Sequence, residues 1–97
     1  MELEQLRIFA AVAEAKSFSA AARALFVSHS TTSRAVSSLE RELGVELLDR
    51  QGRVVRPTPA GEELLKRAEV LLLAAEEAKA AMIPFKKQEN KGERNTP

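Results

Sequence analysis

The stretch Ser19–Leu43, SAAARALFVSHSTTSRAVSSLEREL, decides the fold of this chain. An alanine-rich helical run from Ala20 to Phe26 ends at Val27, and a second helical run begins within a few residues. In the second run, apolar residues recur three and four positions apart, so they share one face of a helix. These apolar residues are Val36, Leu39 and Leu43. The pattern predicts a helix, a tight turn and a second helix.

The other face of the second run is small and polar, with one guanidinium and no carboxylate before Glu40. Such a face suits a polar, anionic partner, and the arrangement matches a helix-turn-helix, whose second helix lies in the DNA major groove. Ser28 is the expected N-cap of this recognition helix, and its first turn reaches base edges. The candidate DNA-contacting residues here are Ser28, His29, Ser30, Thr31, Ser33, Arg34, Ser37 and Ser38.

An alternative is that two amphipathic helices with a solvated Ser/Thr face serve no DNA-binding role, since short motifs have false positives. The distribution of charge favours DNA. The net charge is only +1, but residues 15–39 contain Lys16, Arg23 and Arg34 and no acid. A second unopposed group, Arg50, Arg53 and Arg56, follows in residues 50–57. Two basic patches on a balanced chain are typical of an electrostatic footprint for nucleic acid.

Composition excludes several other classes of protein. The chain has 97 residues, 44% of them hydrophobic and 30% charged, which suits one small domain. It has no Cys and one His, so we expect no disulfide, no metal site and no cofactor. No set of residues supplies a nucleophile, a base and an orienting group, so an enzyme is not expected. The acidic N-terminus and the lack of a long apolar run predict a cytoplasmic protein without a membrane span.

Around the central stretch, the pattern predicts further structural features of the domain. Residues 3–15 read as a first helix, with Leu3, Leu6, Phe9, Val12 and Ala13 on its apolar stripe. After it, Phe18 is expected in the core and Ser19 at the N-cap of the next helix. Ala21 and Ala22 allow close approach to the recognition helix, and Gly44 is expected to end that helix in a left-handed conformation.

A hairpin is predicted between Val45 and Pro57. Two short, partly β-branched segments flank Gln51-Gly52, a plausible two-residue turn. A hairpin after a helix-turn-helix is a wing, and it would offer Arg50, Arg53 and Arg56 to phosphates or to the minor groove. The alternative is a hairpin edge whose arginines are simply solvated.

A long helix follows, with Thr58 as N-cap and Pro59 in its first turn. Its apolar positions form a stripe wider than one small domain covers, and Leu71-Leu72-Leu73 cannot all face one core. We therefore expect pairing with a second copy of the chain. The alternative is a helix packed only on its own domain. The expected dimer residues are Leu65, Ala68, Leu71, Leu72 and Ala75.

The chain resembles the N-terminal DNA-binding region of LysR-type transcriptional regulators. The matching groups include Leu6-Arg7-Ile8-Phe9, Ser17–Ala22, Ser33-Arg34, Leu39-Glu40, Glu42–Val45, Leu47-Leu48, Arg50 and Ala60-Gly61. The resemblance implies a mainly α fold: a winged helix-turn-helix over residues 1–57, a linker/dimerisation helix over 58–83 that pairs antiparallel in a homodimer, and an 84–97 tail that we expect to be disordered. It also implies sequence-specific binding to double-stranded DNA at a pseudo-palindromic operator.

The sequence departs from the family pattern in informative places. His29 stands where the family usually has Gln, so the base preference there is open, because Gln reads adenine with two hydrogen bonds. Thr32 replaces a hydrophobe and is expected to seat the recognition helix less firmly. The family's effector-binding domain is missing, which fits either a fragment or a naturally short homologue, and no effector site is expected in this chain. The alternative function is a helical dimerisation module without DNA binding.

Overall fold

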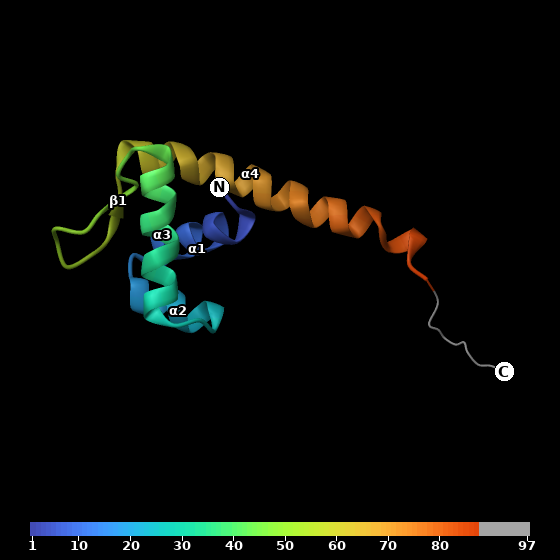
Figure 1. The fold of residues 1–97 in the computed structure, drawn as a ribbon, viewed down its shortest axis with the longest axis horizontal. Coiled ribbons are helices and arrows are strands. Elements are labelled where there is room, and N and C mark those ends of the chain that lie inside the picture. Colours follow the sequence, from blue (N-terminus) through green and yellow to red (C-terminus); the bar gives the residue numbers. More distant parts are fainter. Residues whose placement is uncertain (88–97) are drawn as a thin grey trace.

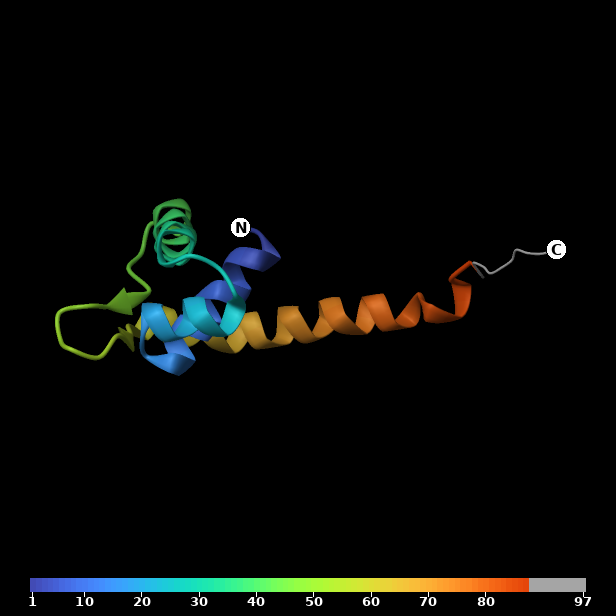
Figure 2. The ribbon, with the colours of Figure 1, turned by 90° about the horizontal axis from the view of Figure 1, so that it is seen from below.

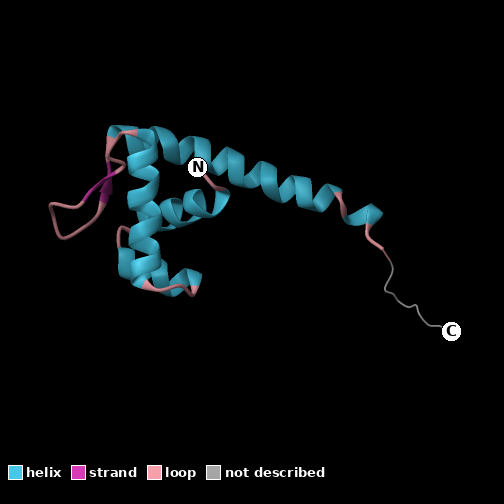
Figure 3. Cartoon of the chain, in the orientation of Figure 1, coloured by secondary structure: helices cyan, strands magenta, loops and turns pink. Residues whose placement is uncertain are grey.

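Residues 1–87, which the structure describes, fold into four α-helices and a short two-stranded hairpin (Figures 1 and 3). The structure is a computed structural model. The elements are α1 (Leu3–Ala15), α2 (Phe18–Leu25), α3 (His29–Leu43), β1 (Leu48–Asp49), β2 (Arg56–Pro57), α4 (Pro59–Ala81) and the 3-10 turn η1 (Ile83–Phe85). The predicted winged helix-turn-helix with a long following helix is confirmed. Of the tail predicted to be disordered, residues 84–97, Pro84 and Phe85 belong to η1, and residues 88–97 lie outside the described residues.

The core forms where α1 packs against α2, α3 and the first half of α4. Its largest fully buried side chains are Phe9, Leu6, Leu39, Leu47, Val12, Val36 and Thr32. The apolar stripes predicted for α1 and α3 are therefore mainly correct. Leu3 and Leu43 are exceptions, because they lie in terminal turns and remain 44% and 39% exposed.

The helix caps explain where the two central helices begin and end. Ser17, not Ser19 as we predicted, caps α2: its hydroxyl accepts a hydrogen bond from the N–H of Ala20 at 3.0 Å. The helix therefore starts one residue before Ser19, at Phe18. It ends at Leu25 because Phe26 adopts a left-handed conformation with φ 59°. Gly44 ends α3 in the same conformation, as predicted.

The hairpin is shorter than predicted, and its loop is longer. Leu48 pairs with Pro57 and Asp49 pairs with Arg56, and residues 50–55 form the loop between them. The predicted two-residue turn is wrong, because such turns need positive φ angles that Gly52 does not adopt. Instead, the carboxylate of Asp49 accepts a hydrogen bond from the N–H of Gln51 at 3.0 Å and bends the chain directly after β1.

Helix α4 gives the molecule its elongated shape, with extents of 63 × 24 × 20 Å. Its first half covers the core, and its second half projects away from the other helices (Figures 1 and 2). Hydrogen bonds from Arg67 and Lys66 hold the pKa of the exposed Glu63 carboxyl below its usual value. Within residues 1–87, no helix has both the length and the apolar content needed to cross a lipid bilayer.

Candidate nucleic-acid interface

One exposed face of α3 carries hydroxyl and guanidinium groups. Ser30, Arg34, Ser37 and Arg41 recur at intervals of three and four residues, which places them on one side of the helix, away from Val36 and Leu39 in the core. Ser33, Arg34, Ser37, Ser38 and Arg41 together line a shallow surface groove of about 390 Å³. This face can donate hydrogen bonds and present positive charge to an anionic surface.

The N-terminus of α3 is organised by the side chain of Ser28. Its hydroxyl oxygen accepts the N–H of Thr31 at 3.0 Å, as predicted for the N-cap, and its O–H donates to the Thr31 hydroxyl at 2.9 Å. Ser28, His29 and Ser30 are all exposed. The buried hydroxyl of Thr32 donates to the carbonyl oxygen of Ser28 at 3.0 Å, so replacing a hydrophobe with Thr leaves no unsatisfied hydroxyl.

His29 lies on the side of α3 that faces the start of α2. Its ring centroid is 6.0 Å from that of Phe18, with the two rings tilted by 43°. This is within the range of favourable aromatic contacts, so the neighbouring ring restricts where the imidazole can lie. Phe18 is half-buried and packs against the core, as predicted.

Arg41 and Gln5 also belong to this surface, although neither was among the predicted DNA-contacting residues. Arg41 lies seven residues after Arg34 on the same face, a helical spacing that could have revealed it. Gln5, from α1, donates to the hydroxyl of Ser38 at 3.4 Å. Ser38 is therefore already partly engaged within the protein, whereas Arg34 and Arg41 form no ion pair within residues 1–87.

The three wing arginines have different surroundings. Arg53 is exposed in the loop and Arg56 is exposed on β2, and neither takes part in an ion pair within the described part of the chain. Arg50 is already engaged, because it pairs with Glu40 at 3.2 Å and lies 4.8 Å from the centre of the Phe18 ring. The prediction grouped these three residues because all are positively charged, and charge alone could not distinguish Arg50 from Arg53 and Arg56.

The wing is attached to the body of the domain by hydrogen bonds and close contacts to its backbone atoms. The hydroxyl of Thr58 donates to the carbonyl oxygen of Glu46 at 2.6 Å, and the N–H of Thr58 donates to that of Leu47 at 2.9 Å. Gly61 lies so close to Leu47 that a Cβ atom would overlap the Leu47 carbonyl oxygen. At the end of the wing loop, the N–H of Val55 donates to the carbonyl oxygen of Lys16, which directly follows α1, at 3.3 Å. These contacts hold β2 and the end of the loop against the domain.

The family model for the bacterial regulatory helix-turn-helix proteins of the lysR family matches residues 3–62, from the start of α1 to the start of α4. This chain belongs to the LysR family. The match spans α1, both helices of the helix-turn-helix and the wing.

Two relatives of this chain have names that describe a transcriptional regulator or a gene activator. It is 49% identical over 87 residues to a probable hydrogen peroxide-inducible genes activator of Streptomyces viridosporus, covering 86% of this chain and 28% of the relative. It is 43% identical over 84 residues to a probable RuBisCO transcriptional regulator of Thalassiosira pseudonana, covering 87% of this chain and 27% of the relative. The chain therefore spans about a quarter of the length of these relatives.

Solved structures share the fold of this LysR family chain. The DNA-binding domain of BenM, in a crystal structure with catB site 1 DNA, has 38% sequence identity and a TM-score of 0.84. The match covers 88% of this chain and 94% of that one. The similarity therefore extends through the wing and well into α4.

Helix α4 of this LysR family chain leaves part of its apolar surface exposed. Of the predicted dimer residues, Ala68 is completely buried within the chain, so it is not available to a partner. Leu65 and Leu72 are half-buried against the domain's own core, and Ala75 is partly exposed. Leu71 is 41% exposed. It begins a stripe at intervals of three and four residues that continues through Ala74, Ala78 and Met82.

Proposed function

We propose that this chain binds double-stranded DNA sequence-specifically, as the DNA-binding part of a LysR-type transcriptional regulator. The observation that carries the proposal is the exposed face of α3, where Ser30, Arg34, Ser37 and Arg41 lie in line and no ion pair within residues 1–87 neutralises either arginine. A recognition helix with such a face fits the major groove, where Arg reads guanine with two hydrogen bonds. The solved complex of the BenM domain with DNA supports this function.

In this proposal, the DNA contacts divide into two groups. The α3 residues Ser28, His29, Ser30, Thr31, Ser33, Arg34, Ser37 and Ser38 face the major groove, with Arg41 added to them. Arg53 and Arg56 contact the backbone or the minor groove from the wing. Residues 1–57 form the DNA-binding domain and residues 58–83 the linker helix. The proposal includes no enzymatic activity and places the protein in the cytoplasm.

We further propose that two copies pair through α4. Leu71, Ala74, Ala78 and Met82 form an apolar stripe without acids or bases, whereas the opposite side, with Val70 and Leu73, is interrupted by Lys66, Glu69 and Glu77. A two-fold pair sets two recognition helices on one face of the duplex, which favours a pseudo-palindromic site.

Titration of the chain with fluorescently labelled duplex DNA across a salt series tests the proposal. Binding through phosphates makes log K fall linearly with log salt, with a slope of about −0.9 for each neutralised phosphate. Enrichment of bound sequences from a random duplex library then yields the operator, which we expect to have two half-sites. A helical dimerisation module without DNA binding would give no salt-dependent change in anisotropy and no enriched sequence.

A further inference from the structure

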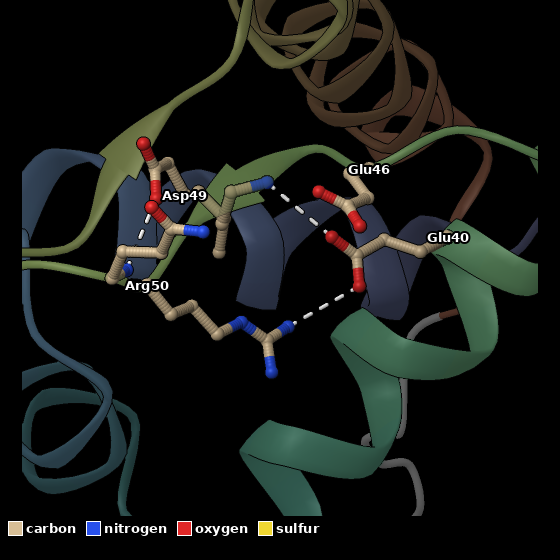
Figure 4. Close-up of a pocket in the computed structure, with 6 residues that line it drawn as sticks. Glu40, Glu46, Asp49 and Arg50 are labelled. Atoms are coloured by element: carbon tan, nitrogen blue, oxygen red, sulfur yellow. Dashed lines mark hydrogen bonds and ion pairs between the residues drawn. The ribbon is translucent and has the colours of Figure 1, made fainter.

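Glu40 connects the recognition helix to the base of the wing (Figure 4). One of its carboxylate oxygens accepts the backbone N–H groups of Leu47, at 2.8 Å, and Leu48, at 3.3 Å. The other accepts a hydrogen bond from the guanidinium of Arg50 at 3.2 Å. The side chain of Glu40 is only 17% exposed. Three N–H donors therefore converge on one largely buried carboxylate. This is a strong attachment, because hydrogen bonds to a charged group are stronger than those between neutral groups.

Arg50 extends this attachment to the other helix of the helix-turn-helix. Its guanidinium carbon lies 4.8 Å from the centre of the ring of Phe18, the first residue of α2, which is a favourable cation–π distance. The same ring is the neighbour of His29 in the first turn of α3. Glu40, Arg50 and Phe18 therefore link both ends of α3 to the start of the wing loop.

We propose that Glu40 and Arg50 are positioning residues for DNA binding, which hold the wing so that Arg53 and Arg56 reach the duplex. The inference rests on the proposed function. The hairpin has only two paired positions before the loop of residues 50–55 begins, so its direction depends on how its base is held. Arg50 acts through Glu40 and Phe18 and does not contact phosphate.

The direction in which removal of the Glu40 carboxylate changes DNA affinity distinguishes a positioning role from simple charge repulsion. A carboxylate near DNA repels phosphates, so its removal alone should strengthen binding. Glu40→Ala should instead weaken it, on the order of tenfold, because the wing no longer holds its arginines against the phosphates. Glu46→Ala is the matched control. Glu46 lines the same surface cavity of about 380 Å³ (Figure 4). Its side chain makes no hydrogen bond within residues 1–87. Binding by this variant should be unchanged or slightly tighter.

A double-mutant cycle tests whether Glu40 acts through the wing. In a chain that already carries Arg53→Gln and Arg56→Gln, Glu40→Ala should cause no further loss of affinity, because the arginines it positions are gone. An equal loss in both backgrounds, or tighter binding in the otherwise wild-type chain, would overturn the proposal. So would an Arg53/Arg56 variant that binds like the wild type.

The same background isolates the role of Arg50. With the two other wing arginines replaced, Arg50→Ala should leave the slope of log K against log salt unchanged. A slope that flattens by about one unit would place Arg50 on a phosphate and would contradict the positioning role.

Hydrogen exchange gives a readout that does not depend on DNA. The amides of Leu47 and Leu48 should exchange several-fold faster in Glu40→Ala than in the wild type, while the amides of Leu6 and Phe9 in the core stay protected and show that the variant is folded. Glu46→Ala should match the wild type. Unchanged exchange at Leu47 and Leu48 would overturn the proposal, whereas a wild-type chain that binds no DNA would refute the proposed function instead.

Discussion

At the scale of single residues, close packing and hydrogen bonding decide which side chains the domain tolerates. Thr58 caps α4 through the N–H of Gly61 and also contacts the two residues before β1. Thr32 is buried with its hydroxyl bonded to the carbonyl oxygen of Ser28. In contrast, Arg34 is exposed on the outer face of α3 and makes no ion pair within residues 1–87. Substitution of a packed, hydrogen-bonded residue should therefore change the free energy of unfolding, whereas substitution of Arg34 should change DNA affinity.

Gly61→Ala should destabilise the domain by about 1–3 kcal/mol, the usual cost of overpacking, because the added methyl group overlaps the backbone of Leu47 and pushes α4 away from β1. Urea denaturation followed by circular dichroism measures the change. Gly52→Ala is the control, since the nearest atoms to its Cβ are 3.9 Å away and belong to Val54. Equal free energies of unfolding for the two variants would mean that the backbone around Gly61 and Leu47 shifts at little cost.

Arg34→Ala should lower affinity for the selected operator by roughly 1–3 kcal/mol and relax the base preference at one position, as expected when a hydrogen-bonded pair with guanine is removed. The unfolding midpoint should stay near that of the wild type, because the side chain lies outside the core. Arg67→Ala, which removes the same charge from α4, serves as the control for net charge. An unchanged enriched sequence for Arg34→Ala would exclude Arg34 from base readout.

At the scale of elements, the helices follow from sequence periodicity, and the wing does not. α1 and α3 have the predicted bounds because their apolar spacing and their caps agree. The wing depends on contacts between residues far apart in sequence, such as Glu40 with the N–H of Leu47 and the N–H of Val55 with the carbonyl oxygen of Lys16. The local sequence does not reveal those contacts. The prediction therefore included a hairpin but misplaced its turn, and it could not distinguish Arg50, which pairs with Glu40, from Arg53 and Arg56.

Replacing Arg53 and Arg56 together with Gln should weaken binding to all DNA sequences alike. The slope of log K against log salt should flatten by about one unit for each phosphate that is no longer neutralised. Lys66→Gln with Arg67→Gln is the matched control, because it removes two positive charges from α4, where both pair with Glu63. Equal slopes for the two double variants would leave the wing arginines as solvated residues.

At the scale of the whole molecule, the two ends of α4 have different surroundings. Its first half completes the core through Leu64, Leu65 and Ala68, while beyond Ala75 every described residue of the helix is exposed. A helix this long is not needed to cover so small a domain, and an exposed apolar stripe on it is typical of an interface. The same geometry determines how far apart two recognition helices would lie in a dimer. Oligomeric state and operator spacing are therefore linked properties of α4.

Leu71→Glu should convert a dimer into monomers that keep the fold and a weak, non-specific affinity for DNA but lose tight binding to a two-half-site operator. Leu65 and Leu72 are poorer choices, because both pack on the domain's own core and charging them would destabilise the monomer. Leu73→Glu is the matched control, since Leu73 is 60% exposed on the side of α4 that carries charged residues, so this variant should remain dimeric. Sedimentation equilibrium and operator titration measure both properties. A wild-type chain that stays monomeric at high micromolar concentration would contradict pairing through α4. Dissociation by Leu73→Glu but not by Leu71→Glu would move the interface to the opposite side of the helix.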